Sequence, residues 1–173
     1  VVGLAGSATF VVFVASVVYL ARRSAAADRL AHASAEVGVL FTGVTIAAGS
    51  IWGKPTWGTW WTWDARLTSV AILFVLYLGY LLLRKMIDDR ERGARYAAVV
   101  GILGALNMPL VHFSVYWWRT LHQPPSLMKP GGMTMPPVIA AGLIVNVVAF
   151  TLLYAYFVTR RVRLLGREAG AMV

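Results

Sequence analysis

Long runs without charged residues are the feature that most constrains this chain. Residues 1–21 contain no charged side chain, and residues 67–83 form a second uncharged run between Arg66 and Arg84. A helix needs about 20 apolar residues to cross the roughly 30 Å hydrocarbon layer of a bilayer. Hydrophobic residues make up 59% of the 173 residues and charged residues 13%, whereas about 25% of residues are charged in an average soluble domain. These runs exclude a water-soluble globule and predict a chain that lies in lipid.

Five segments of the chain are long and apolar enough to be spans. Because lipid offers no hydrogen-bond partners, each span must satisfy its own backbone groups, and unbroken apolar runs do this as α-helices and not as barrel strands. The sequence therefore predicts an all-α, polytopic transmembrane helical bundle that forms a single membrane domain over residues 1–173. The predicted spans are residues 1–21, 30–52, 67–83, 96–113 and 138–159.

The basic residues are divided unequally between the connections. Of the 16 Lys and Arg, 12 fall in residues 22–29, residues 84–95 and the tail from Arg160. Cytoplasmic loops are enriched in basic residues, so this side is predicted to be cytoplasmic. The chain then begins outside, ends in the cytoplasm and has two external connections, residues 52–66 and 114–136. Since the net charge of +9 lies in these short clusters, it indicates membrane topology and excludes a nucleic-acid partner.

All seven tryptophans lie in or beside the two external connections. Five of them fall within twelve residues, at Trp52, Trp57, Trp60, Trp61 and Trp63. An aromatic belt that anchors helices at the headgroups explains one or two tryptophans, and a belt is expected on both sides of a membrane. Positions 57, 60, 61 and 64 are spaced i, i+3, i+4 and i+7, so a helix here would present an indole face that ends in the carboxylate of Asp64. We interpret the cluster as a platform for a large planar ligand and keep the belt as the alternative.

The second external connection adds histidines and cations. His112 lies at a helix end, and His122 lies beyond it, near Trp117 and Trp118. A lone histidine at a helix end is usually hydrogen-bonded, whereas a neutral imidazole in a loop beside aromatic side chains can bind iron. Cations on an external side are unusual and can pair with ligand carboxylates, or with solvent and lipid headgroups. Those on this side are Lys54, Arg66, Arg119 and Lys129.

Indoles for a planar ring, an imidazole for a metal and cations for carboxylates together indicate a haem site. The chain has no cysteine, which excludes thiolate ligands and a thioether bond. It also lacks a glycine-rich phosphate loop, a His-Glu-x-x-His pair and a nucleophile elbow. We therefore expect a protein that handles a cofactor and not an enzyme.

Residues 52–68 resemble the tryptophan-rich WWD signature of haem-handling membrane proteins. They read Trp52-Gly53-Lys54-Pro55-Thr56-Trp57-Gly58-Thr59-Trp60-Trp61-Thr62-Trp63-Asp64-Ala65-Arg66-Leu67-Thr68. Residues 107–123 resemble the same proteins, and the likeness covers nearly the whole chain. Within this group the chain is similar to the cytochrome c maturation protein C family, also called the haem exporter protein C family.

This resemblance implies a six-helix protein of the bacterial inner membrane that holds non-covalent haem b at its external face. It also implies partners, namely a membrane-anchored haem chaperone that receives the haem and the ATPase and membrane subunits of an ABC transporter. His122 matches the family's axial ligand in the second external loop. The family's first helix and its other axial histidine are expected upstream of Val1.

The implied haem site combines both external connections. Trp57, Trp60, Trp61 and Trp63 form its aromatic floor, and Asp64 fixes the loop or orients a neighbouring donor. The full set of implied cofactor-binding residues is Trp52, Trp57, Trp60, Trp61, Trp63, Asp64, Arg66, Trp117, Trp118, Arg119 and His122.

Three other functions remain open. A WWD-type cytochrome c haem lyase, which is an enzyme, would need more helices and more ligand histidines than this chain contains. A haem permease would need polar residues along a central path, and its support within the spans is Glu36, Asn107 and Asn146. A b-type electron-transfer cytochrome would need paired histidines in facing helices, whereas His32 lies on the opposite side from the other two histidines.

Overall fold

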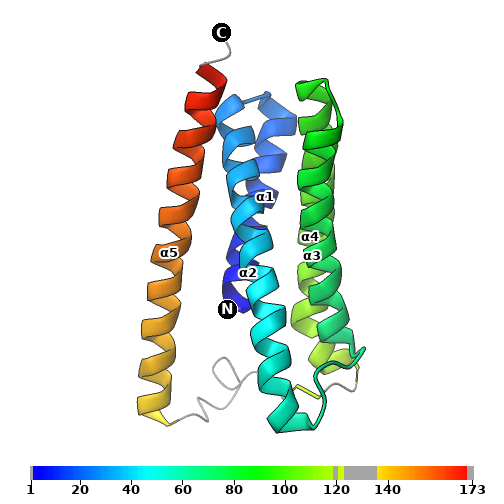
Figure 1. Cartoon of the computed structure of the whole chain (residues 1–173), viewed down its shortest axis with the longest axis vertical. Helices are drawn as coiled ribbons and strands as arrows, with labels where there is room; N and C mark the ends of the chain where they lie inside the picture. Colours follow the sequence, from blue (N-terminus) through cyan, green and yellow to red (C-terminus); the bar gives the residue numbers. More distant parts are fainter. Residues whose placement is uncertain (1, 119–120, 123–135, 171–173) are drawn as a thin grey trace.

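The described part of the chain is a bundle of five α-helices (Figure 1). The computed structural model describes residues 2–118, 121–122 and 136–170, with side chains from residue 6 onward. The helices are α1 (Val2–Arg22), α2 (Ala25–Trp57), α3 (Ala65–Met86), α4 (Arg90–Trp117) and α5 (Pro137–Gly170). The last four are long and apolar enough to cross a membrane, and the described apolar part of α1 is the shorter Gly6–Arg22. The prediction of an all-α membrane helical bundle is confirmed.

The helices extend beyond the apolar runs that predicted them because capping groups set several of their ends. The Ser24 hydroxyl accepts a hydrogen bond from the Ala27 N–H (3.4 Å) and begins α2 five residues before the predicted span. Asp64 caps α3 in the same way, and Asp89 caps α4 by accepting bonds from two N–H groups of the first turn. Such side chains satisfy backbone donors that have no partner within the helix.

Small side chains on α4 allow the central helices to approach closely. Ala97 and Ala98 are buried in the bundle, and Gly101 faces α1. A Cβ added at Gly101 would lie 2.8 Å from the Ser16 Oγ and 2.9 Å from a Val12 methyl carbon. Helices in lipid associate through such small residues, because close backbone approach increases van der Waals contact. The main bundle is thus α1 to α4, with α4 packed between α1 and α3.

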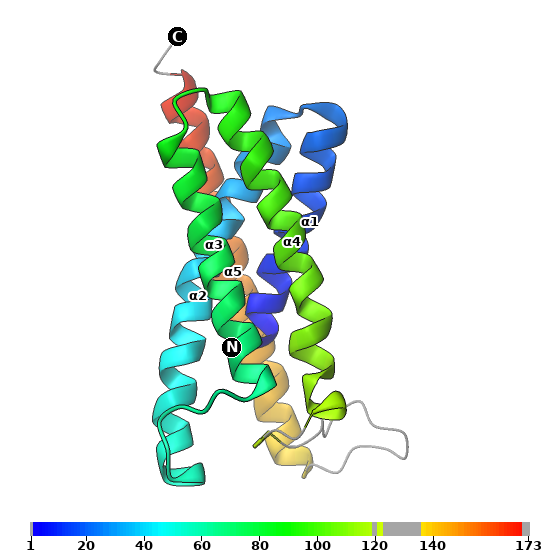
Figure 2. The same cartoon turned by 90° about the vertical axis from the view of Figure 1, so that its right-hand side faces the viewer.

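Helix α5 stands at the side of this bundle and packs mainly on α2 (Figures 1 and 2). Most of its side chains are exposed, and Tyr154 and Val158 are among the few that are buried. The Tyr154 hydroxyl is hydrogen-bonded to the hydroxyl of Ser34 on α2. Among the described residues, no Cα atom of α3 lies within 8 Å of a Cα atom of α5.

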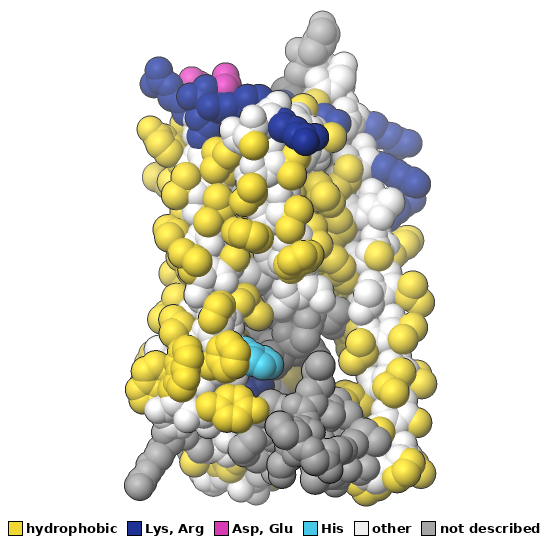
Figure 3. Space-filling view, turned by 180° about the vertical axis from the view of Figure 1, so that it is seen from behind, with side chains coloured by type: hydrophobic (Ala, Val, Ile, Leu, Met, Phe, Trp, Pro, Cys, Tyr) yellow, Lys and Arg dark blue, Asp and Glu magenta, His cyan; other side chains and the backbone are white. Residues whose placement is uncertain are grey.

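The two ends of the bundle differ in charge. Lys and Arg side chains gather where α1 joins α2, where α3 joins α4 and at the end of α5 (Figure 3). We call this the cation-rich end. The opposite end contains residues 58–64, which connect α2 to α3, and we call it the tryptophan end. The fold therefore brings the basic segments that the sequence assigned to one side to the same end of the bundle.

Candidate functional site

The tryptophan segment begins as helix and then leaves it. Residues 52–57 are the last turns of α2, which continues past the start of α3 (Figure 2), and residues 58–64 are not helical. The prediction of a helical indole face over positions 57 to 64 is wrong. Gly58 has a left-handed backbone (φ 78°), and its N–H donates to the Lys54 carbonyl (3.0 Å), which closes the helix in a conformation that favours glycine.

The indoles of this segment pack edge-on against one another. The ring centroids of Trp52 and Trp57 are 5.1 Å apart, and those of Trp61 and Trp63 are 5.6 Å apart. A Cβ added at Gly53 would lie 3.3 Å from the Thr59 carbonyl oxygen and from the Trp57 ring. The side chains of this connection therefore pack against one another and against the end of α2.

Asp64 joins the two predicted connections. Its Oδ1 accepts a hydrogen bond from the Leu67 N–H (2.7 Å) and caps α3, while its Oδ2 lies 3.2 Å from the Nδ1 of His122. The Asp64 side chain is 7% exposed. On its other side, the His122 ring meets the Trp57 indole edge to face, with 4.7 Å between centroids. The structure thus places His122 between the tryptophan segment and the aspartate that ends it.

The surroundings of His122 favour its neutral form. Partial burial lowers the pKa of His122 below its ordinary value of 6.5, and the nearby positive charge of Arg66 lowers it further. The Asp64 carboxylate acts in the opposite direction but does not outweigh these effects. At neutral pH the imidazole therefore keeps a nitrogen lone pair, which is the form that binds metals.

A hollow lies beside Asp64, between the start of α3 and the end of α4. Its volume is about 460 Å³, which is within the roughly 300–1,000 Å³ typical of small-molecule sites. We call it the tryptophan hollow, and it is lined by Trp63, Asp64, Ala65, Thr68, Ser69, Leu110 and Trp118. Trp63 is 80% exposed, so one wall is an open indole surface.

Two polar atoms of the same segment are buried without a hydrogen-bond partner among the described residues. They are the Trp61 Nε1 and the Thr62 Oγ1. Buried donors without protein partners are costly, so such groups commonly bond to a ligand or to water. Trp60, in the same segment, is exposed.

Other predicted site residues lie on α2 and α4 or fall outside the described residues. Trp52 is exposed on α2, and Trp117 is exposed on α4, where it stacks on Phe113 (5.5 Å between centroids). His112 is also exposed on α4 and meets Phe113 edge to face. Arg119 and most of the predicted connection 114–136 lie outside the described residues.

The structure adds lining residues that the sequence analysis missed. Thr68 follows Asp64 by four residues, so a helix capped at Asp64 would have indicated it. Ser69 and Leu110 have no local signal, because the packing of α3 on α4 brings them to the hollow.

The polar residues that supported a permease have separate local partners. The Asn107 Nδ2 donates to the Ser69 carbonyl (2.7 Å), and the Asn146 Nδ2 donates to the Gly142 carbonyl within α5 (2.8 Å). Glu36 is paired with Arg161 at the cation-rich end. Among the described residues, no hydrogen bond or ion pair links these three side chains into the continuous polar path that a permease would need.

The fold and this site define a class, namely polytopic helical membrane proteins with an ordered tryptophan-rich segment at one end. The family model described as Heme exporter protein C matches residues 2–171, and the chain belongs to this family. The sequence prediction of the family is therefore confirmed.

Curated relatives support the same assignment. The chain is 49% identical to the Heme exporter protein C of Bradyrhizobium diazoefficiens over 144 residues, which are 83% of this chain and 55% of that protein. It is 42% identical to the protein of the same name from Haemophilus influenzae over 151 residues, which are 87% of this chain and 61% of that protein. It is 41% identical to the Escherichia coli K12 protein of the same name over 131 residues, which are 76% of this chain and 52% of that protein. The matches thus span half to about three fifths of these relatives.

Proposed function

We propose that this chain handles haem for cytochrome c biogenesis, binding non-covalent haem b at the tryptophan end and passing it to a membrane-anchored haem chaperone. The observation that supports this most is His122 held against Asp64 beside exposed indoles. The relatives' name, Heme exporter protein C, supports haem as the cargo. ABC transporter subunits are the further partners that we propose.

The chemistry of the residues fits a haem. A histidine that binds a metal usually donates its other ring N–H to a carboxylate, and the His122 Nδ1 faces Asp64 in this way. The Nε2 is then the ring nitrogen that would bind iron. A neutral imidazole is needed for this bond, and the lowered pKa of His122 provides it.

The remaining predicted residues have complementary roles. Trp57, Trp60, Trp61 and Trp63 would contact the porphyrin, with Trp52, Trp117 and Trp118 around them. Arg66 and Arg119 would pair with the carboxylates of the haem, and the buried Trp61 Nε1 and Thr62 Oγ1 are donors of matching chemistry. A second axial histidine would come from upstream of Val1.

The proposed orientation follows from the charge of the two ends. We place the cation-rich end and the C-terminus in the cytoplasm and the tryptophan end outside the bacterial inner membrane. The site then faces the compartment in which a chaperone anchored to the outer surface could receive haem.

The experiment that tests haem binding is an absorption spectrum of the purified full-length protein in oxidised and reduced states. We expect a Soret band of six-coordinate low-spin iron in the wild type and a shift towards five-coordinate iron in His122→Ala. Millimolar imidazole should partly reverse the shift. A protein without a Soret band from haem-replete cells, or a spectrum altered by His112→Ala but not by His122→Ala, would contradict the proposal.

Delivery can be distinguished from lyase activity by the product. We propose that haem leaves this site without a new covalent bond to an acceptor made here. Denaturing gels stained for haem, run after incubation with apocytochrome alone, should then show no haem on the apocytochrome.

A further inference from the structure

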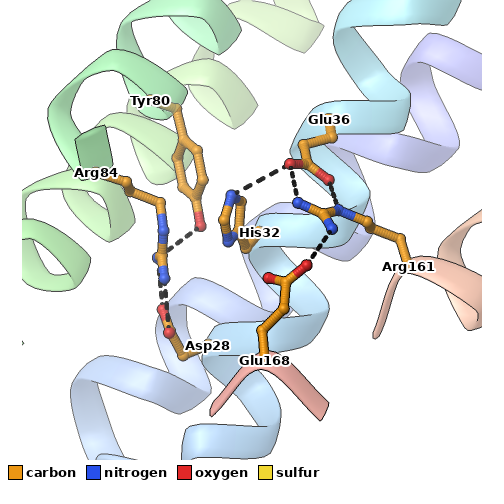
Figure 4. Close-up of polar contacts among 7 residues, drawn as sticks. All are labelled: Asp28, His32, Glu36, Tyr80, Arg84, Arg161 and Glu168. Atoms are coloured by element: carbon orange, nitrogen blue, oxygen red, sulfur yellow. Dashed lines mark hydrogen bonds and ion pairs between the residues drawn. The ribbon is translucent and has the colours of Figure 1, made fainter. Parts of the chain in front are cut away.

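A second hollow lies at the cation-rich end, away from the tryptophans. Its volume is about 370 Å³, and it opens between α3 and α5, whose Cα atoms all lie more than 8 Å apart. Both helices pack on α2, so α2 forms the floor of a groove that the half-buried side chains of His32 and Glu36 line. We call it the α3–α5 groove, and Figure 4 shows the polar side chains around it.

The α3 wall of this groove has an apolar part and a cationic end. Leu78, Leu82 and Lys85 line it at positions i, i+4 and i+7, which lie on one face of a helix. Lys85 is in the last turn of α3, and Leu78 lies about 10 Å deeper at 1.5 Å per residue. Leu78 and Leu82 are exposed. A molecule that fits this wall has an anionic head and an apolar tail.

Ion pairs hold the polar floor of the groove in place. The two terminal nitrogens of Arg84 donate to the two oxygens of Asp28 at 2.6 and 2.7 Å. On the opposite wall, Arg161 from α5 donates to Glu36 and to Glu168 (Figure 4). These pairs tie α3 and α5 separately to α2, so the groove between them is built by the fold.

The charge of this end is complementary to an anion. Lys85 lines the groove and forms no ion pair with a described residue. The same end contains 12 Lys and Arg and only six Asp and Glu, so positive charges outnumber negative charges there by two to one. Basic recesses between transmembrane helices at the cytoplasmic surface are suited to acidic lipid headgroups.

We propose that the α3–α5 groove binds one acidic phospholipid, with its phosphate beside Lys85 and an acyl chain along Leu78 and Leu82. A free phosphate would use this cation but leave the two exposed leucines uncovered. A neutral phospholipid would cover the leucines but gain little from the positive excess. This lipid site is separate from the tryptophan hollow and does not depend on haem binding.

The test is native mass spectrometry of the full-length protein with phosphatidylglycerol and with phosphatidylcholine of the same acyl chains. We expect the wild type to retain phosphatidylglycerol preferentially. Lys85→Gln should weaken that binding about fivefold, because one basic residue near an anionic lipid surface contributes on the order of 1 kcal/mol. Arg163→Gln is the matched control, since it removes one charge from an exposed position of α5 that does not line the groove.

Two further experiments test whether free phosphate can replace the lipid and whether the apolar wall of α3 contributes to lipid binding. Phosphatidylglycerol should raise the thermal midpoint of the wild type, whereas inorganic phosphate at the same concentration should not. Leu82→Ser should weaken lipid retention without changing the charge. Equal losses in Lys85→Gln and Arg163→Gln, equal retention of the two lipids, or an effect of phosphate alone would overturn the proposal. So would a Leu82→Cys variant that crosslinks to another protein in membranes while no lipid is retained.

Discussion

The Asp64 Oδ2 lies 3.2 Å from the His122 Nδ1, although 58 residues separate the two in the sequence. The same carboxylate caps α3 through its other oxygen. The geometry of the imidazole is therefore coupled to the start of a helix, and a displaced Asp64 would affect both. Because Asp64 makes both contacts, substitutions at this residue can distinguish its effect on folding from its effect on the proposed haem binding.

Substitution of Asp64 should separate its two roles. Asp64→Ala removes the cap, which should lower the free energy of unfolding by about 1 kcal/mol, and it also removes the partner of His122. Asn is an effective N-cap, so Asp64→Asn should unfold nearly as the wild type does while binding haem about 10- to 100-fold more weakly. Thermal unfolding and haem titration measure the two effects. Wild-type haem affinity in Asp64→Asn would show that the carboxylate does not position the imidazole.

The pH dependence of haem retention should depend on Arg66. Burial and Arg66 lower the pKa of His122, so its neutral form still predominates when the pH falls to the ordinary histidine pKa of 6.5 and is lost only below it. Arg66→Gln removes one of these causes and raises that pKa, so haem should be lost at a higher pH than in the wild type. A Soret titration between pH 8 and 4 measures the midpoints. Lys54→Gln removes a cation that is not among the causes of the lowered pKa of His122, so it should leave the midpoint unchanged.

The exposed and packed tryptophans should respond differently to truncation. Trp60 and Trp63 are 58% and 80% exposed, so their joint replacement by Ala should spare folding and weaken haem retention roughly tenfold, at about 1 kcal/mol per aromatic contact. The Trp61 Nε1 is buried, and Trp61→Ala should also lower membrane accumulation. Haem retention and accumulation are measured on the same preparations. If the double variant keeps its haem while accumulation falls, the indoles are membrane anchors.

The orientation in the membrane can be tested with single cysteines, because the chain contains none. Asp89→Cys lies between α3 and α4 and should react with an impermeant maleimide only after the membrane is opened. Ser126→Cys, in the predicted second external connection, should react in intact spheroplasts. The reverse labelling would place the tryptophan end in the cytoplasm and contradict the proposed haem delivery.

Close packing of α4 on α1 should make Gly101 intolerant of a larger side chain. A Cβ there would lie under 3.0 Å from two atoms of α1, so Gly101→Val should lower the free energy of unfolding by about 1–3 kcal/mol. Gly79 on α3 has no neighbouring atom within 4 Å of an added Cβ, and Gly79→Val is the matched control. Thermal unfolding in detergent compares the two variants. Equal destabilisation would indicate that helix propensity, and not packing, explains the effect.

The sequence by itself determined the class of fold. Uncharged runs of about 20 residues leave no alternative to helices in lipid, because every backbone group must be paired within its own span. The spacing of basic residues likewise predicted which connections share an end. The tryptophan segment and His122 were recognisable because their residue types are unusual at those places.

Only the tertiary structure decided how these residues meet. The i, i+3, i+4 spacing suggested a helix over positions 57 to 64, but the left-handed Gly58 ends α2 and turns the indoles into a packed connection. The contact of Asp64 with His122 depends on α3 and α4 lying side by side, as does the place of Leu110 in the tryptophan hollow. The α3–α5 groove exists because two helices pack on α2 while their own backbones stay apart. Such contacts between distant residues depend on helix packing, which local periodicity does not specify.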